Sequence, residues 1–218
     1  MKRILLILMA TLMVFCLYAC QTPTSPDVDV NNCYTTELPA AEGRTLFVQF
    51  KMSCGATFVV ELYPEYAPQT VENFQDLVER GFYNGLTFHR ICEGYVIQGG
   101  DPKGDGNGVA ENPIYGEFSD NGFSQNTLTH ERGVISMARR SDDPNSAGTQ
   151  FFIMHATHTR LDGDYAAFGR VVAGMETIDS IAAVPVKEQV HSAEKSKPVE
   201  PPVIESAVFV NYVAEPAE

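Results

Sequence analysis

Two runs of alternating apolar and polar positions begin the part of the chain that we expect to fold. Apolar residues occupy every second position between 46 and 52, with Phe47 as the one exception, and alternation resumes between 58 and 62. Successive side chains of a strand point to opposite faces, so each run predicts a half-buried strand. The turn-forming residues 53–56 lie between the runs and predict a hairpin.

Two other segments repeat apolar residues at helical spacing. The first begins at Pro68, where a missing N–H costs no hydrogen bond, and ends at Gly81, a residue typical of helix ends. Between them Val71, Phe74 and Leu77 define one apolar face. A shorter stripe begins at Met175 and stops before Pro185, which predicts a second helix.

Further short apolar runs are separated by turns rich in Gly and Asp, at residues 86–91, 95–98, 133–138, 151–154, 166–172 and 203–212. The pattern predicts about eight strands, the number that closes a barrel filled by its own side chains. We therefore expect a mainly β protein, a closed eight-stranded antiparallel β-barrel capped by two α-helices. A filled barrel leaves only its outer wall and loops for a functional site. The polar insert 187–197 is expected to be a loop.

The N-terminal segment has the organisation of an export signal. A positively charged start precedes an apolar run over residues 4–19, which is shorter than the about 20 residues of a bilayer span. The run ends in Leu-Tyr-Ala-Cys, which resembles the lipobox of bacterial lipoproteins, where the chain is cut before the Cys and its thiol is acylated. We expect a signal peptide over 1–19 and a lipid anchor on Cys20. A plain signal with a chance cysteine and an uncut signal anchor are the alternatives.

Changes in composition suggest the remaining boundaries. Residues 20–43 are polar, rich in Pro, Thr, Ser and acidic residues, and have no apolar periodicity, which predicts a lipidated, flexible linker. The folded domain is expected over 44–213, followed by a short tail over 214–218.

Charge and cysteine content exclude several classes of function. The net charge of −13 argues against binding to nucleic acid and against a basic membrane-binding face. Cys33, Cys54 and Cys92 would remain beside the anchor after export, and the sequence leaves their pairing open. No cysteine and histidine spacing is typical of a zinc site, so no metal is expected.

Three segments carry residues that strand formation alone does not require, at 88–90, 94–102 and 136–153. Alternation places Gln150 and Phe152 on one face of a strand, and Val96 and Gln98 on one face of another. An amide beside an apolar side chain on an outer face indicates a shallow apolar pocket bordered by hydrogen-bonding side chains. Arg90 can supply a permanent positive charge beside it.

In this order, the motifs Phe-His-Arg, Gly-Tyr-Val-Ile-Gln-Gly-Gly-Asp and Ser-Ala-Gly-Thr-Gln-Phe-Phe-Ile resemble the cyclophilin family of peptidyl-prolyl isomerases, over residues 45–210. The resemblance implies a cyclophilin-like barrel with a proline pocket on its outer wall and no metal or organic cofactor. It assigns catalysis to Arg90, Gln98 and Phe152. The substrate-binding residues that it implies are Tyr95, Val96, Ala138, Arg139, Gln150, Leu161 and Tyr165.

Three positions depart from many members of the family. Arg139 stands where eukaryotic members have Asn, although Arg is usual in bacterial members and its backbone can make the same contacts. Tyr165 replaces a frequent His. Arg160 occupies the position of a Trp in drug-sensitive members, so cyclosporin binding is expected to be weak.

Together the motifs and the export signal predict an exported enzyme of the cell envelope. It would rotate X–Pro bonds of proline-containing polypeptides and assist protein folding outside the cytoplasm, as a monomer held to the membrane through Cys20. A chaperone or scaffold that binds proline segments in the same groove without catalysis is the alternative. A surface lectin is a weaker interpretation, because it would require exposed Trp or a calcium cluster, and the chain has neither.

Overall fold

The computed structural model describes residues 36–108, 112–189 and 192–213. The expected signal peptide, the expected anchor Cys20, Cys33 and the expected tail lie outside these ranges. Within them, no helix has the length and apolar character of a transmembrane span.

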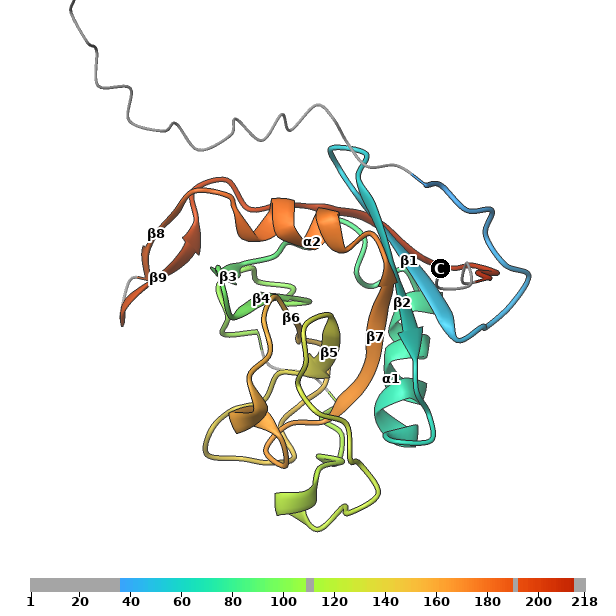
Figure 1. The fold of residues 1–218 in the computed structure, drawn as a ribbon, viewed down its shortest axis with the longest axis vertical. Helices are drawn as coiled ribbons and strands as arrows, with labels where there is room; N and C mark the ends of the chain where they lie inside the picture. Colours follow the sequence, from blue (N-terminus) through green and yellow to red (C-terminus); the bar gives the residue numbers. More distant parts are fainter. Residues whose placement is uncertain (1–35, 109–111, 190–191, 214–218) are drawn as a thin grey trace, which may run out of the picture.

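Eight strands form one sheet in which all neighbouring strands are antiparallel, in the order β10-β1-β2-β7-β5-β6-β4-β3 (Figure 1). Their bounds are β1 (Phe47–Met52), β2 (Thr57–Leu62), β3 (Arg90–Cys92), β4 (Val96–Gly99), β5 (Val134–Met137), β6 (Phe151–Met154), β7 (Ala167–Ala173) and β10 (Ile204–Phe209). Each apolar run identified in the sequence overlaps one of these strands, and the largest differences in length are at β3 and β10, which are much shorter than their runs.

The sheet differs from the expected closed barrel at one place. Strands β3 and β10 form its two edges and are not paired as a ladder. The segment before β3 is joined instead to the beginning of β10 and the residues before it: the Gly85 N–H donates to the Ile204 carbonyl at 2.8 Å, and the Phe88 N–H donates to the Pro202 carbonyl at 3.0 Å. Two consecutive prolines precede β10 and supply no N–H, which limits regular pairing along this edge.

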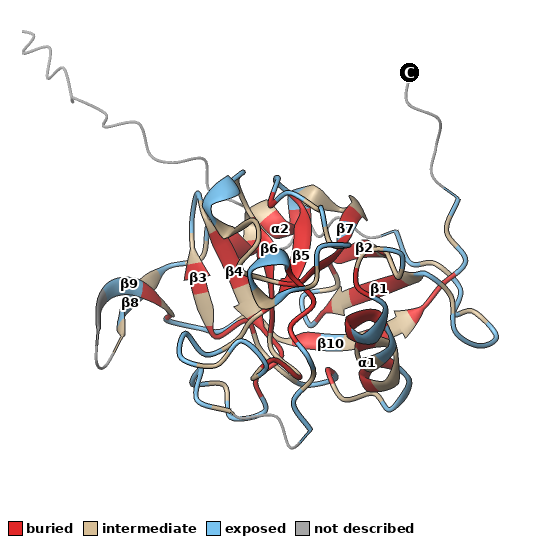
Figure 2. Ribbon diagram, turned by 90° about the horizontal axis from the view of Figure 1, so that it is seen from below, coloured by how far each residue is buried: buried red, intermediate tan, exposed pale blue. Residues whose placement is uncertain are grey.

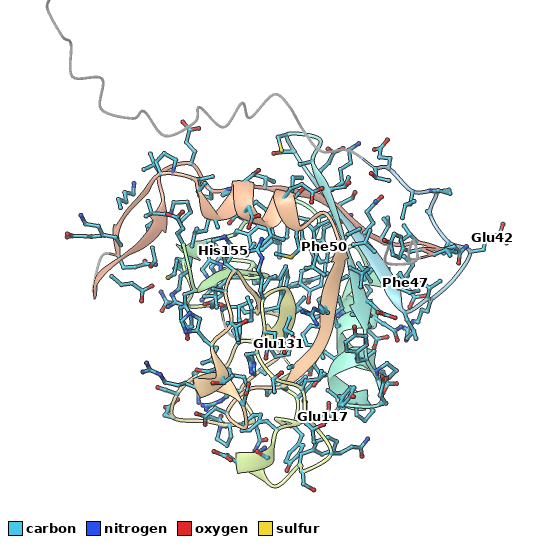
Figure 3. All side chains as sticks on the ribbon, viewed as in Figure 1. Glu42, Phe47, Phe50, Glu117, Glu131 and His155 are labelled. Carbon is cyan, nitrogen blue, oxygen red and sulfur yellow. The ribbon has the colours of Figure 1, made fainter. Side chains whose placement is uncertain are left out.

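The two predicted helices are α1 (Pro68–Glu79) and α2 (Met175–Ala182). The apolar face of α1 is buried, and Figure 2 shows buried residues on the side of α1 that faces the sheet. The helix begins against a distant acid: the buried carboxylate of Glu117, labelled in Figure 3, accepts hydrogen bonds from the backbone of Gln69 and Thr70 at 3.0 and 2.8 Å. Negative charge at this end of a helix is stabilising.

Aromatic rings fill the space between α1 and the sheet. The ring of Phe74 lies 5.9 Å from Phe151 and 5.0 Å from Phe168, and Phe50 stacks on Phe58 at 4.8 Å. All of these rings are fully or almost fully buried, and Figure 3 shows Phe50 within the interior. Because this space is packed, a ligand must bind on the outside of the sheet, as the sequence predicted.

The insert expected to be a loop is a hairpin. Strands β8 (Val186–Gln189) and β9 (Ser192–Pro198) pair with each other in a separate two-stranded sheet, and β9 lies beside β3 (Figure 1). The prediction was wrong because the insert is polar, with no apolar alternation to signal a strand. Backbone pairing holds the hairpin, and its register shifts twice, around Glu188.

Part of the expected linker lies along the domain. The Leu38 N–H donates to Oε1 of Gln49 at 3.1 Å, and Nε2 of Gln49 donates to the Thr36 carbonyl at 2.6 Å. A further hydrogen bond joins the Ala41 N–H to the Phe209 carbonyl at 2.8 Å. Residues 36–41 thus cover the polar face of β1, which is why Gln49 is buried.

We expect Gln49→Ala to lower the free energy of unfolding by about 1–2 kcal/mol, because two hydrogen bonds to the covering segment are lost. Urea unfolding checks this. The control is the same substitution in a chain that begins at residue 43, where the covering segment is absent and the loss should disappear. Equal losses in both forms would contradict this role of Gln49.

Candidate active site

Three strands place the residues expected to carry catalysis directly opposite one another. In the register of the sheet Arg90 of β3 pairs with Gln98 of β4, and Gln98 pairs with Phe152 of β6. Side chains of directly opposed residues lie on the same face of a sheet and within contact distance. Arg90, Gln98 and Phe152 therefore form one row across the outer face.

This row borders a slot of about 190 Å³ on the outer wall of the sheet. Nine of the ten predicted site residues line the slot: Arg90, Tyr95, Val96, Gln98, Ala138, Arg139, Phe152, Leu161 and Tyr165. Phe152 and Val96 are buried, with 5% and 2% exposure. They belong to a small apolar cluster that is separate from the main core, and this cluster forms an apolar floor for the slot.

The tenth predicted residue, Gln150, completes a ladder of amides beside the slot. Nε2 of Gln98 donates to Oε1 of Gln150 at 3.0 Å, and Nε2 of Gln150 donates to the Gly108 carbonyl at 2.9 Å. Gly100 permits the close approach of these strands: its φ is +79°, and a Cβ there would lie 2.4 Å from the Thr149 carbonyl oxygen. The amide ladder thus fixes the orientation of Gln98 next to Arg90.

The guanidinium of Arg90 is held from two directions. Nη1 donates to Oε1 of Gln98 at 3.3 Å. On the other side, Nε and Nη2 donate to the two carboxylate oxygens of Glu194, at 2.9 and 3.2 Å. Burial by itself lowers the pKa of Arg90, but the Glu194 carboxylate raises it above its ordinary value, so the side chain is always charged.

Glu194 belongs to β9 and was not among the predicted site residues. Nothing in its sequence surroundings marks it, since it is one of several charged residues in a polar insert. The hydrogen bonds from Arg90 lower the pKa of Glu194 to about 2, so the ion pair is present at neutral pH.

Arg139 builds the wall of the slot with its side chain. Its guanidinium lies over the ring of Tyr165 at 4.8 Å and over Phe118 at 5.3 Å, and Nε donates to the Asp164 carbonyl at 2.9 Å. Cation–π contacts of this kind fix both partners.

Behind Phe152 lies a buried polar group that the sequence did not reveal. The ring of His130 stacks on Phe152 at 6.0 Å; Nδ1 lies 2.8 Å from Oδ1 of Asp162 and Nε2 lies 3.2 Å from Oγ of Ser136. The order resembles a hydrolytic triad, but Ser136 and His130 are fully buried, so no substrate reaches the hydroxyl. The group supports Phe152 from behind. Tyr165 meets the same ring edge-on at 5.5 Å.

The histidines that follow β6 are also structural. Nδ1 of His155 accepts a hydrogen bond from the Gly94 N–H at 2.8 Å, and Nε2 of His158 lies 2.9 Å from the Gly94 carbonyl. They fix the turn that presents Tyr95. In the described ranges no three His, Cys, Asp or Glu side chains are grouped as a metal ion requires.

Comparison with known proteins gives the class of this site. Residues 47–208 match the family model described as cyclophilin type peptidyl-prolyl cis-trans isomerase/CLD. Peptidyl-prolyl cis-trans isomerase B of Bacillus subtilis is 41% identical over 141 residues, which are 65% of this chain and 94% of that protein. Peptidyl-prolyl cis-trans isomerase CYP65 of Arabidopsis thaliana is 40% identical over 171 residues, 78% of this chain but only 27% of that longer protein.

A solved structure agrees with these matches. The cyclophilin type isomerase of Cryptosporidium parvum, crystallised in the presence of the dipeptide Ala-Pro, has a TM-score of 0.66 and 29% identity, covering 76% of this chain and 99% of its own. The chain therefore belongs to the cyclophilin-type peptidyl-prolyl cis-trans isomerases.

The buried His130 predicts a pH dependence of stability. Burial lowers the pKa of His130 below its ordinary value of 6.5 in spite of the neighbouring Asp162. The unfolded chain therefore takes up a proton more readily than the folded one, and the stability that His130 contributes is complete above pH 6.5 and declines as the pH falls below it. Urea unfolding at pH 7 and pH 5 should show this loss.

The loss between these two pH values should be smaller in His130→Gln, which does not titrate. Burial also lowers the pKa of His89, so part of the pH dependence remains in this variant and should disappear when His89→Phe is added. The same pH dependence in wild type and both variants would contradict the assignment.

Proposed function

We propose that the slot catalyses rotation about X–Pro bonds of exported polypeptides, with Arg90 as the group that stabilises the rotated state. The observation that carries this proposal is the row of Arg90, Gln98 and Phe152 on three adjacent strands, beside a slot with an apolar floor. Membership of the isomerase family supports it, as does the relative crystallised with Ala-Pro.

The chemistry requires no nucleophile. The X–Pro amide resists rotation with a barrier of about 18–20 kcal/mol, because the nitrogen lone pair is shared with the carbonyl. When the bond is half rotated this sharing is lost, and the nitrogen becomes a hydrogen-bond acceptor. A donor fixed against that nitrogen stabilises the rotated state more than either planar isomer, which is what lowers a barrier.

Arg90 retains donors for this task although it is paired. A guanidinium has five N–H groups, of which two are directed to Glu194 and one to Gln98. Two remain for the substrate. Arg suits the role better than Lys because its charge is permanent and its geometry is rigid.

The slot would bind the proline ring, while the side-chain amides beside it bind the peptide backbone. Phe152, Val96, Leu161 and Tyr95 supply apolar surface that excludes water from the rotating bond. Gln98 and Gln150 are the polar groups next to Arg90, and they are preorganised by their own hydrogen bond. Their proposed role is to hold the carbonyl side of the substrate while the proline side turns.

We also infer that the hydrogen bonds between residues 85–88 and 202–204 complete a closed barrel, so that β3, which carries Arg90, is held on both sides. We propose action as a monomer, because a single copy of the chain supplies the complete row of Arg90, Gln98 and Phe152.

The proposed location is the bacterial cell envelope, with the chain anchored by lipid on Cys20. The support is the sequence: a charged start, an apolar run over 4–19 and the lipobox-like Leu-Tyr-Ala-Cys. Arg139, the residue usual in bacterial members at this position, agrees with a bacterial source. In that setting the enzyme would assist folding of exported proteins.

Arg90→Ala should reduce cis–trans exchange of a short X–Pro peptide by about a hundredfold, the usual effect of removing one preorganised donor. Exchange is measured by NMR with the purified chain. Arg90→Lys should restore little, since it lacks the rigid fork. Arg80→Ala, which removes a charge outside the slot, is the matched control and should behave as wild type.

This assay also separates the enzyme from the non-catalytic binding module. Peptide binding without exchange in the wild-type chain would favour the binding module. Full exchange in Arg90→Ala would show that the role given to Arg90 is wrong.

Cys20→Ser should abolish lipid attachment and release the protein from the membrane fraction of a bacterial host. Mass spectrometry of the mature N-terminus is the measurement, and an acylated cysteine as residue 20 is the expected result for wild type. A mature chain that begins elsewhere, or one that retains residues 1–19, would contradict the anchor.

A further inference from the structure

We infer that Glu194 is a positioning residue for Arg90, and that the β8–β9 hairpin exists in part to deliver it. The inference rests on the isomerase function proposed above and deepens it. The hairpin contributes one side chain to the edge of the slot, 104 residues along the chain from the arginine that it binds.

The geometry is that of a two-point clamp. Both carboxylate oxygens of Glu194 are used, one by Nε and one by Nη2 of Arg90. Paired hydrogen bonds of this kind fix the plane of the guanidinium as well as its position. Gln98 holds the remaining nitrogen from the opposite side, so the group has contacts at all three of its nitrogens.

Glu194 is itself held in place by its neighbours. Sγ of Cys92, two residues from Arg90 along β3 and on the same face, donates to Oε1 of Glu194 at 2.9 Å. Burial raises the pKa of Cys92 to about 12, so the thiol keeps its proton and remains a donor at neutral pH. The neighbouring Ser196, which is fully buried on β9, further lowers the pKa of Glu194.

A clamp is useful here because the slot is shallow. The Arg90 side chain is 28% exposed, and a long flexible side chain at a surface takes up many conformations unless it is fixed. Any ordering that substrate must impose raises the barrier, whereas a donor held in advance adds no such cost.

The same pair does not block the slot. Arg90 lines the slot in the paired conformation, together with Phe152 and Gln98, and two of its N–H groups stay available. Glu194 contacts the edge of the guanidinium on the hairpin side. The carboxylate therefore orients the donor without displacing it from the substrate.

The test compares Glu194→Ala and Glu194→Gln with Glu188→Gln, a matched control that removes an exposed charge from the other strand of the same hairpin. With an X–Pro peptide at neutral pH, we expect Glu194→Ala to lower kcat about tenfold while KM stays within about twofold, because loosening a donor costs less than removing it. Glu194→Gln, which keeps one acceptor, should lose less. Glu188→Gln should match wild type.

Two further measurements exclude a merely structural effect. In the Arg90→Ala background, Glu194→Ala should cause no additional loss of kcat, because the carboxylate then has no guanidinium to position. The Arg90 Nε–H signal in nitrogen-15 NMR spectra should be sharp in wild type and broadened or shifted in Glu194→Ala, while urea unfolding of both remains similar.

Three outcomes would overturn the inference: unchanged kcat in Glu194→Ala, an equal loss in the Arg90→Ala background, or a higher kcat, which would make the carboxylate an inhibitor. Each is distinct from failure of the proposed function, which is recognised by full activity of Arg90→Ala alone. If Arg90→Ala is inactive and Glu194→Ala is unaffected, the enzyme assignment stands and only the positioning role is lost.

Discussion

The arrangement of the domain depends on the alternation of side chains along β6. Phe151 points inward and packs against Phe74 of α1, whereas Phe152, the next residue, forms the floor of the slot. One strand therefore supplies both the core and the site, and a shift of its register by one residue would exchange the two rings. The tightly packed interior leaves the substrate only the outer wall, and it gives that wall a rigid backing.

Of the two arginines that line the slot, Arg90 is the one in the row with Gln98 and Phe152. Arg90 lies between a ladder of amides on one side and the Glu194 carboxylate on the other, so it is fixed by partners of two different kinds. The chain as a whole carries a net charge of −13, yet the acid that contacts this cation comes from an insert outside the main sheet. The main sheet thus supplies the neutral partner of Arg90, the amide of Gln98, and the insert supplies the charged partner, the carboxylate of Glu194.

The sequence predicted the helices, the main strands and the site residues Arg90, Gln98 and Phe152, which the structure then places in one row, because alternation and family motifs both report on local side-chain placement. It did not predict β8 and β9, since a hairpin held by backbone pairing has no apolar pattern. Glu194 was missed for the same reason, and His130 was missed because its contact with Phe152 depends on tertiary packing. The edge between β3 and β10 depends on the path of the chain around the sheet, which short-range patterns do not describe.

The segment 36–41 is attached to the domain at β1 and β10. Ala41 bonds to Phe209 at the end of β10, so the beginning and the end of the folded part meet at β1 and β10. Figures 1 and 2 both place this side of the molecule away from β3 and β4, which carry the slot. The segment 36–41 therefore lies against β1, on the side of the molecule away from the slot. An extended polypeptide bound beside Arg90 would leave segment 36–41 in place on β1, so substrate binding and the attachment of this segment do not compete for the same surface.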